Sequence, residues 1–311
     1  MAADLENSVL VYDVGGSHVS AAVCLSDSYR LGPVVSAPHP AEQTSDAFIH
    51  LLYSLGVKAS TGRVGGAELA VPGPFDFAAG VSRMKHKLPY LYGVDLRGKL
   101  AERFGWQPSQ VRFLLDSAAF LLGEIGAGEA HGVARAVGVT LGTGIGSAFA
   151  VDGRVVTEGQ GVPPGGEIWN LPYEGGIVED FLSTRAIQRG YKLRTGALPD
   201  VARIAAEAAD DMDAAAVFTE FGRHLGLALG MKLAAFGPQV VVLGGGISRS
   251  SHLFLPAAMK ELDGLNMQLR VSTLLDRAPL AGAAVAWFNG SNGAHAPSPH
   301  PADNLLHADA I

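Results

Sequence analysis

The sequence predicts an α/β fold built from two similar halves, and two observations lead to that prediction. The segments VYDVGGSHVSAAV and GVTLGTGIGSAFA follow one pattern, in which a strand, a glycine-rich turn and a return strand succeed one another. The run VVVLG from Val240 is short, continuous and apolar, which is typical of a strand buried on both faces of a sheet. We therefore expect two similar α/β halves that face each other across a cleft.

The composition is that of a globular protein with ample material for a core. Of its 311 residues, 48% are hydrophobic and 17% are charged, and the net charge is -7. This acidic balance disfavours nucleic acids and anionic membranes as partners, although backbone amides still allow a small anionic ligand. One cysteine, Cys24, excludes a disulfide framework or a cysteine-based zinc site within the chain. With no signal-peptide pattern and no apolar run near the roughly 20 residues of a membrane span, we expect a cytoplasmic protein.

The first half of the chain alternates strands and helices. SVLVYDVGGSHVSAAVCL predicts a hairpin that turns at Gly15 and Gly16, and AFIHLLYSLG predicts a helix that ends at Gly56. AELAVPGPFD predicts a strand broken by a Pro-Gly turn, and VDLRGKLAERFG predicts a helix. VRFLLD predicts a strand that ends at Asp116, and SAAFLLGEIGAGEA predicts the helix launched from it.

The second half begins with the repeated hairpin, which turns at Gly142. Over residues 177–236 the apolar spacing predicts mainly helices, and Gly237 with Pro238 gives a strong stop. The buried strand in QVVVLGGGIS follows, and then a helix over 253–262, a strand near LRVST and a last helix in APLAGAAVAWF.

The expected domain boundaries follow the two halves. Residues 1–116 with 278–290 form a smaller amino-terminal lobe, and residues 117–277 form a larger lobe. Beyond this the composition shifts to Gly, Ser, Asn, Pro and His, so residues 291–311 are expected to be a flexible tail. The histidines of the tail are irregularly spaced among prolines, which favours a solvated segment over a metal-binding tract: His295, His300 and His307.

The first glycine turn has the composition of a site for a magnesium nucleotide. The pair Gly15 and Gly16 lets successive amides point at one spot, and Ser17 adds a hydroxyl donor. Asp13 at the strand end would repel a phosphate unless a metal ion lay between them, which fits Mg²⁺ carried by the nucleotide. The alternative is a tight hairpin in which Asp13 accepts hydrogen bonds from turn amides.

Two further glycine turns repeat this chemistry. The second offers closely spaced glycines and one hydroxyl donor: Gly142, Thr143, Gly144 and Gly146. The third, Gly244 to Gly246, follows a buried strand, where open α/β sheets place ligands, and suits a flat group such as adenine or ribose. Neither of the first two is a P-loop, and each turn alone is compatible with a plain hairpin. The three together favour a nucleotide.

Six segments of the chain, in this order, carry a family resemblance: DVGGSHV, LAVPGPFD, LLDSAAFLLGE, GVTLGTGIGSAFAVDG, GGEIWN with GIVEDFLSTRAI, and PQVVVLGGGIS. They resemble the first phosphate motif, Pro-Gly loop, catalytic-aspartate segment, second phosphate motif, sugar-binding stretch and adenosine motif of the ROK family (repressor, open reading frame, kinase). That family lies within the sugar kinase, actin and heat-shock ATPase (ASKHA) superfamily. The resemblance runs from about Leu10 to Phe288.

The resemblance implies an α/β fold of two actin-like (ribonuclease H-like) lobes, with ATP and Mg²⁺ in the interlobe cleft and a hexose between the lobes. It implies transfer of the γ-phosphoryl group to a sugar hydroxyl, usually the 6-hydroxyl, and a homodimer. It assigns the phosphates and Mg²⁺ of ATP to the first two turns: Asp13, Gly15, Gly16, Ser17, Gly142, Thr143, Gly144 and Gly146. It assigns the adenosine to Gly244, Gly245 and Gly246, and the sugar to Gly73, Asp116, Glu167, Asn170 and Glu179.

Three carboxylates carry the expected chemistry. Asp116 is the candidate general base, because a carboxylate within hydrogen-bond reach of the acceptor hydroxyl orients it and takes its proton. The alternative is that Asp116 only caps the following helix. Glu167 and Glu179 match the sugar-binding glutamates of the family, and a carboxylate can accept two vicinal hydroxyls at once. For both, the alternative is a solvated acid, which is common at a helix start such as that of Glu179.

The chain departs from the family pattern around the sugar. Where the family has Gly-His and a cysteine-rich zinc segment, this chain has Trp169, Asn170 and LPYEGG, so we expect no structural zinc. Trp169 and Tyr173 either fill the space of the metal loop or belong to the core. Leu115 and Lys87 stand where the family usually has asparagine, so two sugar hydrogen bonds are missing or replaced.

The leading hypothesis is an ATP-dependent hexokinase or glucokinase, with fructose, mannose and N-acetylated hexosamines still open. A catalytically silent sugar or nucleotide sensor is the alternative from another class. A family repressor is disfavoured because the first phosphate motif begins at Asp13, which leaves no room for a DNA-binding domain. The basic cluster of Lys85, His86 and Lys87 is either a solvated loop or a site for an anionic substrate group or a polyphosphate donor.

Overall fold

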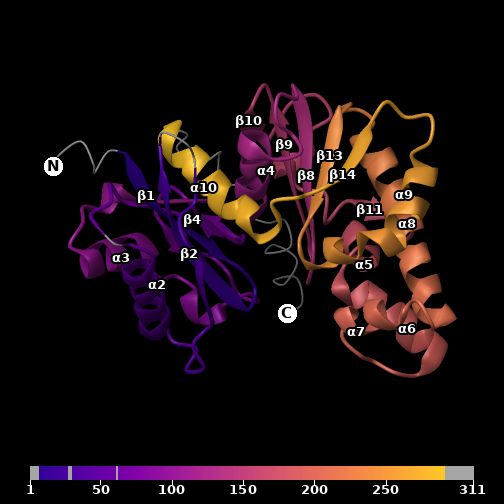
Figure 1. The fold of residues 1–311 in the computed structure, drawn as a ribbon, viewed down its shortest axis with the longest axis horizontal. Coiled ribbons are helices and arrows are strands. Elements are labelled where there is room, and N and C mark those ends of the chain that lie inside the picture. Colours follow the sequence, from indigo (N-terminus) through magenta and orange to yellow (C-terminus); the bar gives the residue numbers. More distant parts are fainter. Residues whose placement is uncertain (1–6, 27–29, 61, 291–311) are drawn as a thin grey trace, which may run out of the picture. The chain divides into compact units, whose positions relative to one another are not determined.

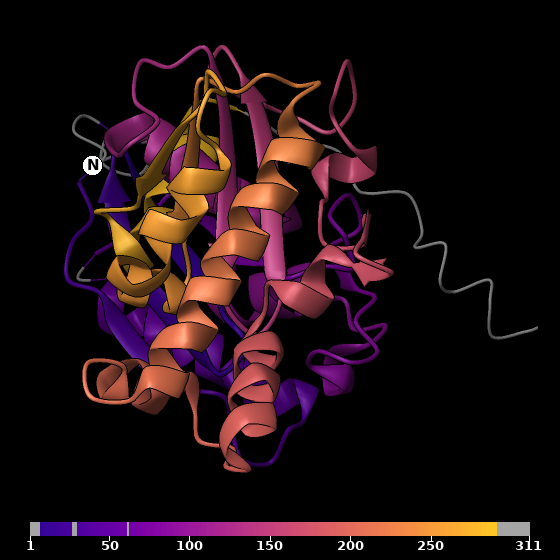
Figure 2. The same cartoon turned by 90° about the vertical axis from the view of Figure 1, so that its right-hand side faces the viewer.

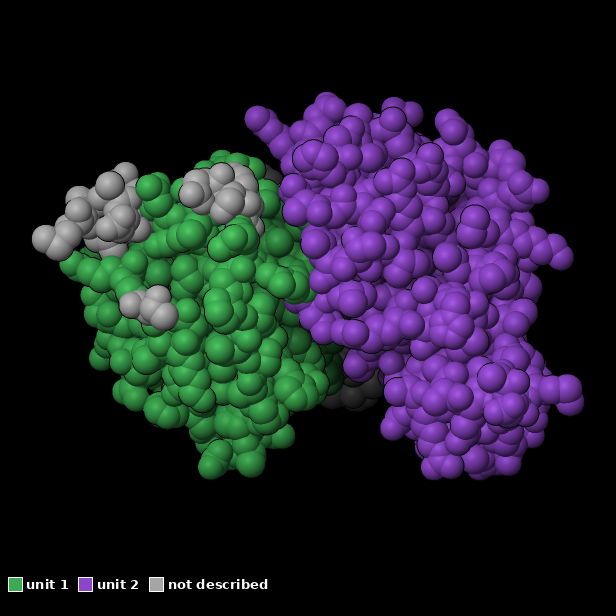
Figure 3. All heavy atoms as spheres, viewed as in Figure 1, with its two compact units in different colours: residues 1–123, 277–311 green, residues 124–276 purple. Residues whose placement is uncertain are grey.

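The computed structural model describes residues 7–26, 30–60 and 62–290, and it divides into two compact units (Figure 3). Unit 1 takes the described residues up to Gly123 and from Arg277 onward, and unit 2 is Glu124–Asp276. The expected tail at 291–311 and its histidines lie outside the described residues. That the units act as lobes around a cleft, with boundaries at 116/117 and 277/278, stays a prediction.

Each unit contains one five-stranded mixed sheet, and the two sheets have the same strand order (Figure 1). In unit 1 the order is β3-β2-β1-β4-β7, and in unit 2 it is β10-β9-β8-β13-β14. In both, the first three strands are antiparallel neighbours and the last three run parallel. The duplicated hairpins predicted from the sequence, β1-β2 and β8-β9, are therefore the matching centres of two sheets.

The strands have the following bounds. In unit 1 they are β1 Ser8–Val14, β2 His18–Leu25, β3 Val35–Pro38, β4 Ala67–Val71, β5 Phe75–Asp76, β6 Val81–Ser82 and β7 Val111–Leu115. In unit 2 they are β8 Arg135–Leu141, β9 Ile145–Val151, β10 Arg154–Val156, β11 Pro172–Tyr173, β12 Gly176–Ile177, β13 Val240–Gly244 and β14 Gln268–Val271.

Helices cover the sheets. The α-helices are α2 Ser45–Ala59, α3 Leu96–Phe104, α4 Asp116–Ala127, α5 Val178–Phe181, α6 Thr184–Thr195, α7 Val201–Glu207, α8 Met212–Leu233, α9 Ser251–Glu261 and α10 Ala278–Phe288. In unit 1, α2 and α3 cover one face of the sheet and α10 packs against β1, β2 and β4. In unit 2, α8 and α9 pack against each other along the sheet (Figure 2). Among the described residues, no helix is both long and apolar enough to cross a membrane.

The helix that the sequence predicts to end at Gly56 continues to Ala59, so that prediction is wrong. A Cβ on Gly56 would lie 2.7 Å from the Phe104 ring and 2.8 Å from Leu10, and it would also meet the Tyr12 hydroxyl. The glycine therefore lets α2 approach β1 and α3 closely, and it does not terminate the helix. The other predicted strands and helices are present.

Candidate active site

In unit 1, three candidate residues or turns follow the carboxyl ends of adjacent parallel strands. The first glycine turn follows β1, Gly73 follows β4, and Asp116 follows β7. Parallel strands end at one edge of their sheet, so the fold gathers these positions. The pairing of Val71 with Leu115, and the 3.5 Å between the Leu115 methyl carbon Cδ1 and a Cβ built on Gly73, confirm that Gly73 lies beside the end of β7.

The first glycine turn is closed by its own backbone. The Gly15 N–H donates to the His18 carbonyl (3.0 Å), and the Ser17 carbonyl accepts from the His39 N–H (3.0 Å). The Ser17 hydroxyl lies 2.9 Å from Nδ1 of His18. Gly16 is exposed, it does not have a left-handed backbone, and no described heavy atom lies within 4 Å of a Cβ built there. Neither packing nor backbone conformation thus requires a glycine at this position.

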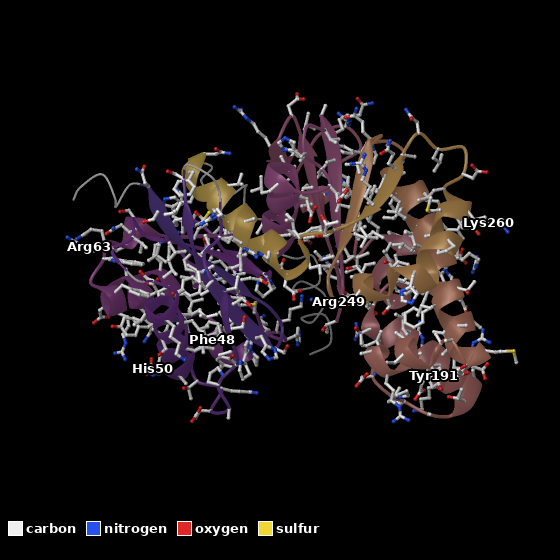
Figure 4. The ribbon with its side chains drawn as sticks, in the orientation of Figure 1. Phe48, His50, Arg63, Tyr191, Arg249 and Lys260 are labelled. Atoms are coloured by element: carbon white, nitrogen blue, oxygen red, sulfur yellow. The ribbon has the colours of Figure 1, made fainter. Side chains whose placement is uncertain are left out.

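His39 is a neighbour of this turn that the sequence did not single out. Its ring packs edge-on against Phe48 (5.7 Å between ring centroids), a core residue labelled in Figure 4. Burial lowers the pKa of His39, and the carbonyls of His18 and Gly15 oppose that shift. The ring is therefore neutral at pH 7 and adds no positive charge beside the turn.

Asp116 is the first residue of α4, and its side chain is half-buried. Its Oδ1 accepts a hydrogen bond from the Ser117 N–H (2.7 Å), which fixes the orientation of the carboxylate. Both roles considered from the sequence thus remain compatible with this geometry. A carboxylate held by one oxygen in this way can direct the second oxygen to a substrate hydroxyl.

In unit 2, the second and third glycine turns lie together. Gly245 has φ +81°, and a Cβ on it would lie 2.8 Å from the backbone N of Leu141, the residue that precedes the second turn. This contact and the left-handed backbone both require glycine at 245. Gly142 and Gly246, in contrast, have no described heavy atom within 4 Å of a built Cβ.

The third turn continues into a short 3-10 helix, η4 Gly246–Ser250. The Ser248 hydroxyl donates to the Gly245 carbonyl (2.7 Å), and this hydrogen bond holds the turn against the start of the 3-10 helix. At the end of this helix, Arg249 pairs with Asp276 at 2.5 Å (Figure 4). Gly245 and Gly246 are exposed, whereas Gly244, the last residue of β13, is buried.

Glu167 and Asn170 lie in the loop that leads from η3 Pro164–Gly166 to β11. The loop is fixed by buried Ser147, whose hydroxyl donates to the Gly166 carbonyl (2.7 Å) and accepts from the Ile168 N–H (3.0 Å). Oε2 of Glu167 accepts a hydrogen bond from the Trp169 indole N–H (2.9 Å). Asn170 is exposed.

Glu179, on α5, lies directly against the second glycine turn. Its Oε2 accepts from the Ile145 N–H (3.2 Å), and its carboxyl carbon is 3.1 Å from a Cβ built on Gly144. Its Oε1 pairs with the Arg185 guanidinium (3.2 Å). The structure thus brings a candidate sugar residue and a candidate phosphate turn into contact, which sequence reasoning did not predict.

Tyr173 is buried and packs edge-on against Phe181 and His224, and its hydroxyl lies 2.9 Å from Nδ1 of His224. It belongs to a two-stranded ribbon whose turn residues, Glu174 and Gly175, both have positive φ, as a tight hairpin requires. Trp169 also packs against the unit 2 core. Within the described ranges, no group of three or more His, Cys, Asp or Glu side chains is arranged to hold a metal ion.

Three comparisons with known proteins point to one family and one fold. A model of the ROK family matches residues 9–289. The glucokinase of Thermotoga maritima is 31% identical over 244 residues, or 68% of this chain and 76% of that protein. The N-acetyl-D-glucosamine kinase of Yersinia enterocolitica is 25% identical over 264 residues, or 78% of this chain and 85% of that protein. The crystal structure of a ROK hexokinase from Thermus thermophilus matches with a TM-score of 0.75 and 29% identity, covering 92% of this chain and 100% of that one.

Proposed function

The chain belongs to the ROK family and has the actin-like α/β fold that the sequence predicted, and from this premise we propose that it is an ATP-dependent hexose kinase. The proposed reaction transfers the γ-phosphoryl group of ATP to the 6-hydroxyl of a hexose, with glucose as the first candidate. Its relatives include a glucokinase and an N-acetyl-D-glucosamine kinase, so the sugar is the least constrained part of the proposal.

The observation that carries the proposal is the set of glycines that the fold itself does not require. Gly16, Gly142 and Gly246 lie in three separate turns, each at the carboxyl end of a strand of a central sheet, with open space where a Cβ would be. Glycine at such positions lets a ligand approach the backbone amides, which donate to phosphate or nucleoside groups. We assign the phosphates to the first two turns and the nucleoside to Gly244, Gly245 and Gly246.

Magnesium would enter with the nucleotide, and the residues present fit it. Mg²⁺ in phosphate-transfer sites needs only one or two carboxylates besides water and phosphate oxygens, and Asp13 supplies one, two residues before Gly15. The ion would neutralise charge on the phosphates. Asp13, at the end of β1, would hold it or its water shell, and Gly15, Gly16 and Ser17 would donate to the phosphate oxygens.

Asp116 is the proposed general base. The sugar hydroxyl donates to its carboxylate, the hydroxyl oxygen bonds to the γ-phosphorus, and the bond from phosphorus to the bridging oxygen breaks as ADP leaves. The proton passes to Asp116. We assign Glu167, Asn170 and Glu179 to the other sugar hydroxyls, because carboxylate and amide oxygens accept hydrogen bonds from them. Gly73 would give the sugar room beside the end of β7.

Release of ADP from Mg-ATP by the full-length protein tests the proposal against a panel of neutral and N-acetylated hexoses. Sugar-dependent turnover is expected, and Asp116→Asn should lower kcat by about 10²–10⁴-fold with no change in thermal stability. Asparagine keeps an acceptor for the Ser117 N–H but cannot take the proton.

The matched control is Asp95→Asn, because Asp95 caps α3 through the Gly98 N–H (2.8 Å) and asparagine caps equally well. Its turnover should equal that of the wild type. If the wild type shows no sugar-dependent turnover with any sugar of the panel, first with ATP and then with polyphosphate, the kinase is rejected and a sensor is favoured. Full activity of Asp116→Asn would reject the general base. A homodimer and a cytoplasmic location are part of the proposal, and light scattering and cell fractionation test them.

A further inference from the structure

A continuous chain of hydrogen bonds runs through unit 2 from Glu167 to the second glycine turn, and Trp169 is its central member. The Trp169 indole N–H donates to Glu167 (2.9 Å), and the Trp169 backbone carbonyl accepts from the Glu179 N–H (3.0 Å). The Glu179 carboxylate then accepts from the Ile145 N–H (3.2 Å). Two candidate sugar residues and one candidate phosphate turn are thus connected through one side chain and one peptide group.

The turn at the end of this chain is fixed from two sides. The Gly142 carbonyl accepts from both the N–H and the hydroxyl of Thr184 (2.8 and 2.9 Å), at the start of α6. The Gly142 N–H donates to the Gly144 carbonyl (2.9 Å). Thr143, between Gly142 and Gly144, is exposed, so a ligand can reach its backbone amide.

The negative charge of Glu179 beside the second glycine turn has a positively charged partner. A carboxylate next to a phosphate site is repulsive, and Glu179 lies against Gly144. The Arg185 guanidinium pairs with the other oxygen of Glu179, although its own side chain is 73% exposed. Arg185 therefore offsets part of the negative charge of Glu179.

We propose that Trp169 is a positioning residue that couples the sugar site to the phosphate turn, so that sugar binding raises nucleotide affinity. The inference depends on the proposed function, because Glu167 and Glu179 must contact the sugar. A bound sugar restricts both carboxylates. Through Trp169 and Ile145 it also restricts the second turn, so the nucleotide then loses less conformational freedom when it binds. Linkage requires the effect to be reciprocal.

Titration calorimetry with a non-hydrolysable ATP analogue, with and without saturating sugar, measures this coupling. The full-length wild type should bind the analogue about 5- to 150-fold more tightly in the presence of sugar. Trp169→Phe keeps an aromatic ring in the core but removes the indole N–H. Its sugar KM should rise, and the coupling factor should fall by about tenfold or to unity, because a hydrogen bond to a charged group is lost. Its affinity for the analogue without sugar should change little.

The matched control is Trp106→Phe, because Trp106 stacks on Phe104 in unit 1 (4.2 Å between ring centroids). It should keep the wild-type coupling factor. Hydrogen exchange at the Ile145 amide gives a second readout that a purely structural role of Trp169 would not move. Sugar should protect this amide in the wild type and in Trp106→Phe, and much less in Trp169→Phe.

The outcomes separate the two proposals. A wild type that binds and phosphorylates a sugar, with the same coupling factor in Trp169→Phe, overturns the coupling and leaves the kinase. A wild type whose affinity for the ATP analogue does not change with sugar also overturns the coupling and leaves the kinase. A wild type that binds no sugar of the panel counts against the kinase and, with it, against the role of Trp169.

Discussion

The two sheets have identical strand order, yet they differ sharply at one equivalent position. When the two hairpins are aligned, β1, β4 and β7 bring Glu68 beside Arg112 in unit 1, and β8, β13 and β14 bring Val242 beside Arg270 in unit 2. One sheet thus holds an ion pair where the other holds a valine beside an arginine. The shared topology therefore follows from the strand pattern and the hairpins, and not from this particular pair.

The ion pair of unit 1 lies under α10. The Glu68 carboxylate is fully buried, and its Oε2 is 2.7 Å from the Arg112 guanidinium. Arg112 also donates to the Ala286 carbonyl (3.0 Å) and lies over the Trp287 ring at 4.4 Å. The second oxygen of Glu68 has no hydrogen-bond partner among the described residues. Burial raises the pKa of Glu68 to about 7, against the opposing effect of Arg112.

The largest effect should come from removing one member of the pair. Arg112→Leu leaves Glu68 buried without its hydrogen-bonded counter-charge and should lower the free energy of unfolding by about 3 kcal/mol at pH 8. The double change Glu68→Val with Arg112→Leu replaces the ion pair with two apolar side chains and should come within about 1 kcal/mol of the wild type or exceed it. Urea unfolding followed by circular dichroism measures both. Equal losses in the single and the double variant would mean that the charge of Glu68 is not what makes the single change costly.

The same pair should make the stability of the protein depend on pH. Because the pKa of Glu68 is raised to about 7 by folding, its contribution is fully present below the pKa of the unfolded chain and is lost as the pH rises through 7. Glu68→Gln does not titrate, so its stability relative to the wild type should increase between pH 4.5 and pH 7, by at most about 3 kcal/mol. Thermal unfolding at half-unit pH steps tests this. A constant difference across that range would place the Glu68 pKa near its ordinary value in the folded protein.

The sequence predicted the parts of the fold that depend on local pattern. The two hairpins, the buried strand at Val240 and the order of helices all follow from periodicity and glycine turns. The helix end at Gly56 was wrong because a glycine that permits close packing looks, in sequence, like a glycine that ends a helix. Glu68 and Arg112 are 44 positions apart, so no local pattern could pair them.

The sequence also predicted only those parts of the candidate site that depend on local pattern. The turns and Asp116 lie at strand ends, which the sequence locates, although their functional roles remain predictions. The contacts of Trp169 with Glu167 and of Glu179 with Ile145 depend on how a loop and a short helix return to the sheet. The sequence did contain one local indication of the contact with Glu179. In GTGIG, Gly144 is a glycine, and the structure shows that a larger residue there would meet the Glu179 carboxylate.

The smallest expected effect on stability distinguishes the glycine turns of the two units. A methyl group on Gly16 meets open space, whereas one on Gly144 overlaps the Glu179 carboxylate. Gly16→Ala should therefore change the free energy of unfolding by less than about 0.5 kcal/mol and raise the KM of ATP, with the KM of the sugar unchanged. Gly144→Ala should cost about 1 kcal/mol, because Glu179 must leave the Ile145 N–H, and it should raise the KM of both substrates. Steady-state kinetics, with ATP and the sugar varied in turn, measures the two KM values for each variant. If Gly144→Ala raised the KM of ATP alone, Glu179 would have no part in binding the sugar, and the two turns would be equivalent in function as well as in fold.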